Sequence, residues 1–262
     1  MSGLSYAEIQ SIIESEDPVA LVTIVRGEPL GRKIAIFEDG RVLGSLGIAE
    51  LDQAATKLGH EHLADDRSGL IHLREDVQAF IEVYARPPHL VLIGAVHTAI
   101  ALGHIGKLLG FRVTVVDARE RFATRERFPH VDELVIAWPD EALDRMRIDS
   151  RTYIAILTHD PKFDEPALKS ALARPARYIG AIGSRKTSAD RIGRLKRQGL
   201  TDEQLAKIHA PIGLNLGART PEEIALSIAA EIVAVRRGQI GHLPRQFVSH
   251  AIRPDAIDAA LS

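Results

Sequence analysis

A loop of small residues in the middle of the chain has the composition of a phosphate-binding turn. Residues 94–99 read GAVHTA; they follow a short apolar run and open a segment with helical spacing. In a G-x-G-x-x-G/A loop, backbone N–H groups at the helix start bind the phosphates of a dinucleotide. We therefore expect four residues to face a phosphate: Gly94, Ala95, His97 and Thr98. Val96 stands at the second glycine position, so a tight turn with a packed valine is the alternative interpretation.

Two residues after the next apolar run could bind the sugar of such a ligand. Asp117 ends that run, at the place where a dinucleotide fold carries an acid for a ribose hydroxyl. Arg119 lies two residues further on, so a ligand with an additional phosphate on the ribose is also compatible with this segment. The charged run that follows, residues 119–127, is expected to be a solvated face.

A second candidate for anion binding is the segment 183–187, with the sequence GSRKT, which opens another predicted helix. Backbone N–H groups and the helix dipole favour negative charge there, and an arginine adds a fork of donors. Basic residues in a first helical turn oppose the dipole, which a bound anion would explain. We expect Gly183, Ser184 and Arg185 to hold a second anionic group, and an ordinary serine N-cap with solvated cations is the alternative.

A histidine and an aspartate follow a third apolar run, in the sequence Thr158-His159-Asp160. Histidine titrates near neutral pH, so His159 and Asp160 are the candidates for proton transfer, although no catalytic cycle is assigned to them. Thr158 is expected to lie beside them at the ligand. The alternative is that Asp160 caps a turn before Pro161 and that His159 only packs.

Two further glycines, Gly213 and Gly217, lie in the segment 211–219, just before a strongly capped helix. Glycines in such a segment indicate that the backbone comes close to another group. That group is either the ligand or another strand, and the residues do not decide between them.

The elements that must position these loops alternate in type. Short apolar runs predict strands over 90–93, 113–116, 134–137, 154–157 and 178–182. Helical spacing is found over 99–109, 141–146, 165–173 and 184–198. This alternation predicts an α/β fold with a parallel, Rossmann-type sheet covered on both faces, which binds ligands at the carboxyl ends of its strands.

One more helix is predicted with a defined start and end. Thr220 is its N-cap, Pro221 its first residue and Glu223 the partner in a capping box. An apolar stripe at helical spacing follows, and Gly238 ends the helix. The stripe consists of Ile224, Ile228, Ile232 and Val235.

The N-terminal third has a different pattern. Three β-rich runs, a helix and a further strand are predicted over 19–25, 33–37, 41–46, 49–58 and 78–84. Asp39-Gly40 between two of the runs is typical of a hairpin, and the pair Pro87-Pro88 is typical of a linker. We therefore expect a small α+β domain with a β-meander over 1–86, the Rossmann-type domain over 87–240, and a tail over 241–262.

Composition excludes several classes of protein. The net charge is −2, so nucleic acid is not an expected partner. No apolar run reaches the roughly 18 residues of a membrane span, and residues 1–17 lack the apolar core of a secretory signal, so a cytoplasmic location is expected. The chain has no cysteine, which excludes disulfides, thiolate zinc sites and iron–sulfur clusters. No metal site is expected, because His60 and His62 lack a ligand pattern.

In this combination and order, the segments resemble the XdhC/CoxI family of accessory proteins for xanthine dehydrogenase and related molybdenum enzymes. The match runs from about residue 87 to residue 238, and it is looser over the N-terminal residues VALVTIVRGEPLGRKIAIFEDGRVLGSLG. The segments that carry it are HLVLIGAVHTAIAL, GFRVTVVDAR, ERFPHVDE, LTHDPKFD, YIGAIGSRKT and HAPIGLNLGARTPEEIALSIAAEIVAVRRG.

The resemblance implies a Rossmann fold and a chaperone-like protein rather than an enzyme. Such a protein binds molybdenum cofactor (molybdopterin) and assists its sulfuration and its insertion into a xanthine dehydrogenase-type molybdenum hydroxylase. The implied partners are that client enzyme and a cysteine desulfurase or an XdhC-like paralogue, and a homo-oligomer is possible. Molybdopterin carries a phosphate, or a pyrophosphate in its dinucleotide form, which suits anion-binding loops at strand ends.

Two departures from the family pattern keep other functions open. The loop that commonly reads GAGH is GAVH here, and residues 44–50 lack the cysteine that many members carry in a glycine-rich turn. An NAD(P)-dependent oxidoreductase, with Asp117 on the ribose and His159 in proton transfer, is the first alternative. A nucleotide-sensing Rossmann module without chemistry is the second.

Overall fold

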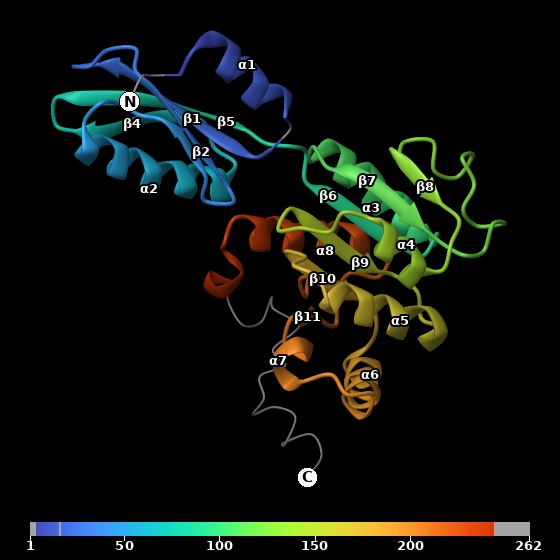
Figure 1. Cartoon of the computed structure of the whole chain (residues 1–262). Helices are drawn as coiled ribbons and strands as arrows, with labels where there is room; N and C mark the ends of the chain where they lie inside the picture. The colour runs from blue at the N-terminus through green and yellow to red at the C-terminus, as the bar shows by residue number, and fades with distance from the viewer. Residues whose placement is uncertain (1–3, 16, 244–262) are drawn as a thin grey trace. The chain divides into compact units, whose positions relative to one another are not determined.

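A computed structural model describes residues 4–15 and 17–243 (Figure 1). The chain divides between Arg86 and Pro87 into two compact units. Of the tail predicted over 241–262, residues from 244 onward lie outside the described residues. In the described part of the chain, no helix combines the length and the apolar character that crossing a membrane requires.

The N-terminal unit is a five-stranded antiparallel sheet with one helix on each face. Its strands are arranged in the order β3-β2-β1-β5-β4. Their bounds are β1 Val19–Arg26, β2 Lys33–Phe37, β3 Val42–Gly44, β4 Gly69–Arg74 and β5 Val77–Tyr84. Alternate residues of β1 point to opposite faces, so Val22 packs in the core under helix α2 (Ala49–Asp65), and Leu21 packs in the core under helix α1 (Tyr6–Glu14).

Three features of this unit differ from the prediction. Helix α1 and strand β4 were not expected, and α2 extends well beyond residue 58. A glycine inside a helix usually weakens it, but Gly59 lets α2 lie against the sheet. A Cβ atom at this position would stand 3.0 Å from Cδ1 of Ile36, so packing on β2 favours a glycine here.

The C-terminal unit confirms the predicted α/β fold class. Six parallel strands are arranged in the order β11-β10-β9-β6-β7-β8, which is the 3-2-1-4-5-6 arrangement of a Rossmann fold. The strands are β6 His89–Ile93, β7 Arg112–Val116, β8 Glu133–Val135, β9 Thr152–Ile156, β10 Tyr178–Ala181 and β11 Ile208–His209. Strand β11 was not predicted, because two residues are too short to show a period.

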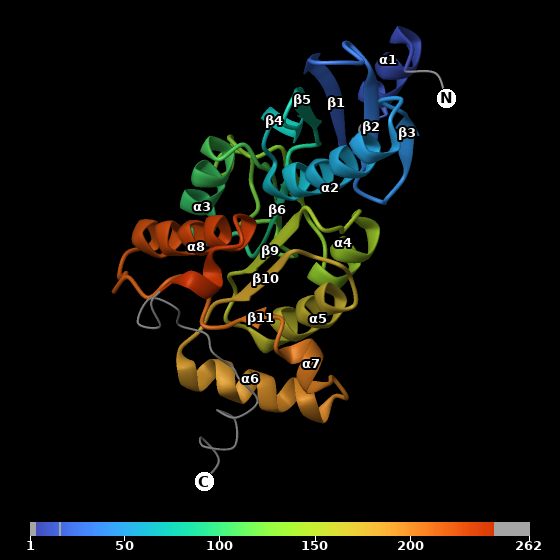
Figure 2. The same cartoon turned by 90° about the vertical axis from the view of Figure 1, so that its left-hand side faces the viewer.

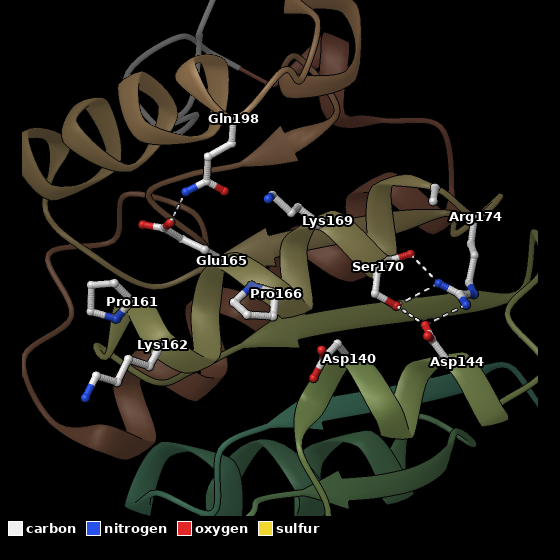
Figure 3. Close-up of a pocket in the computed structure, with 11 residues that line it drawn as sticks. Asp140, Asp144, Pro161, Lys162, Glu165, Pro166, Lys169, Ser170, Arg174 and Gln198 are labelled. Atoms are coloured by element: carbon white, nitrogen blue, oxygen red, sulfur yellow. Dashed lines mark hydrogen bonds and ion pairs between the residues drawn. The ribbon is translucent and has the colours of Figure 1, made fainter.

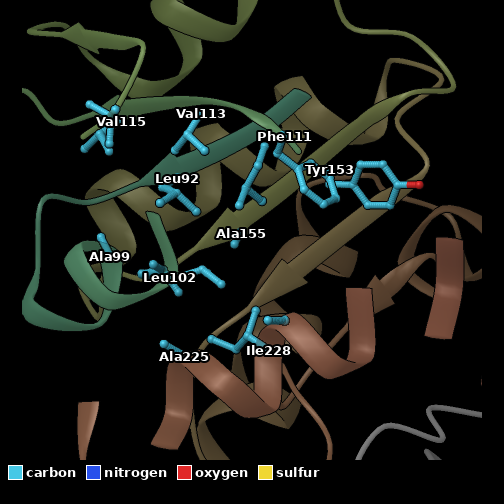
Figure 4. Close-up of a cluster of buried hydrophobic side chains, with 14 of the residues drawn as sticks. Leu92, Ala99, Leu102, Phe111, Val113, Val115, Tyr153, Ala155, Ala225 and Ile228 are labelled. Carbon is cyan, nitrogen blue, oxygen red and sulfur yellow. The ribbon is translucent and has the colours of Figure 1, made fainter. Parts of the chain in front are cut away.

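Helices cover both faces of this sheet (Figure 2). Helices α3 (His97–Leu108) and α8 (Pro221–Arg236) pack side by side on one face. The other face carries α4 (Pro139–Arg145), α5 (Pro161–Leu172), α6 (Arg185–Arg197) and α7 (Asp202–Leu205). A 3-10 turn, Ile240–His242, follows α8. The core between the sheet and the α3–α8 pair includes Leu92, Leu102 and Ile228 (Figure 4).

The predicted start of α8 is confirmed in detail. The Thr220 hydroxyl accepts a hydrogen bond from the Glu223 N–H, and the Glu223 carboxylate accepts one from the Thr220 N–H. Ile228 and Ile232 of the predicted stripe are fully buried against the sheet. The capping box and the stripe both act within a few residues, which is why a local pattern predicts this helix well.

Candidate functional site

The predicted loops meet at the carboxyl edge of the parallel sheet. Strand β6 pairs with β7 on one side and with β9 on the other, and β9 pairs with β10. The loops after β6, β7, β9 and β10 contain Gly94, Asp117, Thr158 and Gly183, respectively. The chain leaves β6 and β9 in opposite directions across the sheet, so a topological switch point lies between these two strands. In a sheet of this kind that is the ligand-binding position.

Gly94 lets the two loops at the switch point touch. Its φ angle is +107°, a backbone conformation that residues other than glycine rarely adopt. A Cβ atom at this position would stand 2.5 Å from Cγ2 of Thr158. A glycine is therefore required both by the backbone conformation and by the contact between the loops after β6 and β9.

The first turn of α3 is open to an anion. Val96 is the N-cap residue, and the described part of the chain provides no side-chain cap and no acidic residue in that turn. His97 is exposed at the helix start, whereas Thr98 and Ala95 are buried. Unpaired N–H groups at a helix start form an anion site together with the helix dipole.

Helices α5 and α6 begin at the same edge and have the side-chain caps that α3 lacks. The Asp160 carboxylate accepts a hydrogen bond from the Lys162 N–H at 3.0 Å and caps α5. The Ser184 hydroxyl accepts one from the Thr187 N–H at 3.1 Å and caps α6. Asp160 and Ser184 thus have the capping roles of the alternative interpretations, while His159 and Arg185 are exposed beside them.

Asp117 binds its neighbours within the chain rather than standing free. Its two carboxylate oxygens accept hydrogen bonds from the Ala95 N–H at 2.8 Å and from the N–H, Nε and Nη2 of Arg119 at 2.8–2.9 Å. The carboxylate is buried, which by itself raises its pKa, but the hydrogen bonds from Arg119 and Ala95 outweigh burial and lower the pKa overall. Asp117 therefore connects the loop after β7 to the loop after β6.

This lowered pKa predicts how acid affects the fold. A carboxyl whose pKa is lower in the folded state stabilises the fold above its unfolded pKa, and this contribution is lost as the pH falls through the folded value. We expect Asp117→Asn to lower the free energy of unfolding at pH 7 by about 1.5–3 kcal/mol. The difference from the unaltered protein should shrink below about pH 4. Urea unfolding between pH 7 and pH 3 measures this difference in the free energy of unfolding. Asp190→Asn, at an exposed position, is the control. A difference that did not change with pH would contradict the role of the Asp117 charge.

The charged run 119–127 is solvated in part, as the sequence predicted: Glu120, Arg121, Arg125 and Glu126 are exposed, but Arg119 and Arg127 are partly buried. Arg127 donates hydrogen bonds to the carbonyl oxygens of Ala95, at 3.0 Å, and Phe122, at 2.7 Å. Its guanidinium thus holds the segment after β7 against the loop after β6. Arginine alternating with glutamate gives no local sign of this role, because the partner at Ala95 is distant in the sequence.

A buried ion pair lies next to the loops after β9 and β10, at the carboxyl edge of the sheet. Arg191 of α6 and Asp164 of α5 are 2.8 Å apart, and both side chains are only 2% exposed. The Thr158 hydroxyl donates to Asp164, and Arg191 also donates to the carbonyl oxygen of Ile182 at 2.9 Å. Burial raises the pKa of Asp164, although Thr158 and Arg191 oppose that shift. This network, which the sequence did not reveal, joins the loops after β9 and β10.

The two glycines of segment 211–219 have different surroundings. A Cβ atom at Gly213 would stand 2.6 Å from Oγ of Ser227, and the Gly213 N–H donates to Glu231 at 2.9 Å. The neighbour of Gly213 is therefore helix α8, and not the ligand or strand that the sequence suggested. Gly217 has φ +73°, and no described atom would lie within 4 Å of a Cβ atom added there.

An open groove runs along α4 and α5 to Gln198, at the end of α6 (Figure 3). Two contacts join side chains that line it: Arg174 pairs with Asp144 at 2.7 Å, and Gln198 donates a hydrogen bond to Glu165 at 2.7 Å. This groove does not contain the loops that the sequence singled out, apart from the start of α5. Within the described residues, no group of three or more His, Asp and Glu side chains is arranged to hold a metal ion.

Comparison with known proteins assigns both units to families. The model of the XdhC Rossmann domain matches residues 90–232, and that of the XdhC and CoxI family matches residues 12–74. A crystal structure described as a xanthine dehydrogenase from Bacillus halodurans shares the fold, with a TM-score of 0.55 and 19% identity over 93% of this chain and 99% of that one.

Curated relatives are longer than this chain. The uncharacterized protein YqeB of Escherichia coli K12 is 29% identical over 91% of this chain and 47% of its own length. A probable xanthine dehydrogenase subunit of Bacillus subtilis 168 is 30% identical over 64% and 49%. The molybdenum cofactor insertion chaperone PaoD of Escherichia coli K12 is 36% identical over 36% and 29%. The chain thus spans about half the length of the first two. From the family models that match its two units, this chain belongs to the XdhC and CoxI family.

Proposed function

We propose that this protein binds molybdenum cofactor and assists its insertion into a xanthine dehydrogenase-type molybdenum hydroxylase. The observation that carries the proposal is the uncapped start of α3 at the switch point of the parallel sheet. A phosphate fits there, because N–H groups and the helix dipole both favour negative charge. The names of two relatives, the cofactor insertion chaperone PaoD and the probable xanthine dehydrogenase subunit of Bacillus subtilis, support the same class of ligand and client.

The proposed roles of the residues follow from their positions. The first turn of α3, with His97 and Thr98, would hold the phosphate, and Arg127 would keep Ala95 in place. Gly94 would shape the loop rather than donate to the phosphate, because its N–H donates to the carbonyl oxygen of Val116 at 2.8 Å. Asp117 would act by positioning Arg119 rather than by binding a hydroxyl, since its oxygens already accept four hydrogen bonds. Gly183, Ser184 and the exposed Arg185 would hold a second anionic group at the end of β10.

Sulfur for the cofactor would come from a partner. Sulfur transfer through a protein proceeds by a thiolate and a persulfide, and these 262 residues contain no cysteine. A cysteine desulfurase or a cysteine-bearing paralogue would therefore act on cofactor held by this chain. The chain would contribute the position of the cofactor and a surface for docking.

The substitution His97→Glu tests the phosphate site. A carboxylate in the first turn of α3 is expected to stabilise the helix by about 0.3–1 kcal/mol. It should at the same time repel the phosphate and weaken cofactor binding at least about tenfold. Each protein is purified from a molybdenum-competent host and oxidised, and the released pterin is measured by fluorescence and molybdenum by mass spectrometry.

The matched control is Leu108→Glu, at the other end of the same helix, where the side chain is 87% exposed. It adds the same charge far from the first turn, so its pterin content should equal that of the unaltered protein. An unchanged pterin content in His97→Glu would show that α3 does not bind the phosphate. Absence of pterin from the unaltered protein would overturn cofactor binding itself.

An NAD(P)-dependent oxidoreductase is the second candidate. The strand order and the loop after β6 favour it, and the exposed His159 lies at the same edge for proton transfer. The hydrogen bonds within the chain that occupy Asp117 disfavour it, because the acid that would bind the ribose is engaged. Turnover of a nicotinamide cofactor would support this candidate over the first.

A further inference from the structure

Two aromatic side chains from separate loops stack at the carboxyl edge of the parallel sheet. Trp138 precedes α4 and Phe163 lies in the first turn of α5; their ring centroids are 4.8 Å apart and their planes differ by 17°. They follow strands β8 and β9, which are separated in the sheet by β7 and β6. The stack therefore spans the ends of β7 and β6, and β6 borders the switch point.

A cation continues this stack toward the candidate phosphate site. The guanidinium of Arg119 lies 5.5 Å from the ring of Phe163 and 4.7 Å from that of Phe122. Its orientation is fixed by the hydrogen bonds to Asp117, which in turn binds the N–H of Ala95 in the loop before α3. The aromatic stack and the start of α3 are thus connected through Arg119 and Asp117.

Trp138 keeps much of its surface in contact with solvent. It is 46% exposed, and the neighbouring Ile136 is 52% exposed, whereas Phe163 is half-buried. Packing within the domain explains the face of the indole that meets Phe163, but it leaves the exposed part without a role. An aromatic surface of this kind binds flat nitrogen heterocycles by stacking.

We propose that the exposed surface of Trp138 binds the fused nitrogen heterocycle of the ligand, with Phe163 supporting the indole and Arg119 beside it. The ring is either the pterin itself or the purine base of a nucleotide form. This inference rests on the proposed function, because it assumes that the phosphate of the same ligand contacts α3. It assigns the region after β7, β8 and β9 to the ring and the start of α3 to the phosphate.

The fluorescence of the protein gives a direct test, since Trp138 is the one tryptophan in the sequence. We would titrate the full chain with 6-hydroxymethylpterin, with GMP and with ribose 5-phosphate, and correct for absorption with N-acetyltryptophanamide. Saturable quenching by a ring-bearing probe and none by ribose 5-phosphate is expected. The probe that quenches at the lower concentration identifies the ring as pterin or purine.

Variants separate stacking from other effects. Stacking on an aromatic side chain is worth about 1–3 kcal/mol per ring. The affinity of Trp138→Leu for the ring-bearing probe, measured by calorimetry, should therefore be about tenfold lower than that of the unaltered protein. Trp138→Phe, which keeps an aromatic surface, should retain most of the affinity. Ribose 5-phosphate should bind both variants as it binds the unaltered protein, and thermal melting should show that both are folded.

The outcomes distinguish this inference from the proposed function. If ribose 5-phosphate binds and His97→Glu abolishes that binding, but the ring adds no affinity, the phosphate site stands and the role of Trp138 is wrong. Equal affinity of the ring-bearing probe for Trp138→Leu and Trp138→Phe would also overturn it. If no probe binds, both the ring site and the phosphate site are wrong.

Discussion

Replacing Arg191 by methionine is expected to lower the free energy of unfolding by about 3–5 kcal/mol. Arg191 and Asp164 are each 2% exposed, so the substitution leaves a buried carboxylate without its cation. It also removes the hydrogen bond to the carbonyl oxygen of Ile182. Methionine has a similar length, so lost packing contributes little. Urea unfolding followed by circular dichroism measures the change.

The neighbouring pair on the same two helices is the matched control. Arg194 binds Glu165 at 2.5 Å, but its side chain is 34% exposed, so Arg194→Met should cost no more than about 1 kcal/mol. The double variant Arg191→Met with Asp164→Leu should recover most of the lost stability, since a buried ion pair can be replaced by apolar side chains at little cost. Equal effects of Arg191→Met and Arg194→Met would show that burial of the pair does not matter.

The second large effect is expected from Gly94→Ala, which should destabilise the fold by about 2–5 kcal/mol. A side chain at positive φ costs about 1–2 kcal/mol, and Gly94 has φ +107°. The added methyl would also stand 2.5 Å from Cγ2 of Thr158, and overpacking of this kind costs about 1–3 kcal/mol more. Thermal unfolding of the full chain measures the sum.

Gly110→Ala separates the two contributions. Gly110 follows α3 with φ +79°, and no described atom lies within 4 Å of an added Cβ atom. This control should therefore show the conformational cost alone, about 1–2 kcal/mol. If the two glycine variants lost equal stability, the loops after β6 and β9 would have room to separate. If the proposed phosphate site is right, Gly94→Ala should also bind less cofactor, because the loop before α3 must move.

Some parts of this protein are determined by its sequence alone. The strands β6, β7, β9 and β10, and the helices between them, could be predicted because short continuous apolar runs and helical periods reflect burial within a few residues. The start of α8 could be predicted because the capping box of Thr220 and Glu223 is a local interaction. The position of the candidate site at the strand ends followed from the parallel fold class, and the order of the motifs indicated the family.

Other parts depend on contacts between segments distant in the sequence, and only the tertiary structure decided them. The pairing of Arg191 with Asp164 and the hydrogen bonds of Arg127 to Ala95 join residues whose separation follows no local period. The stack of Trp138 on Phe163 likewise requires the loops after β8 and β9 to meet. Local patterns report which residues are buried or capped, but the partner of a long side chain is chosen by the packing of the whole domain.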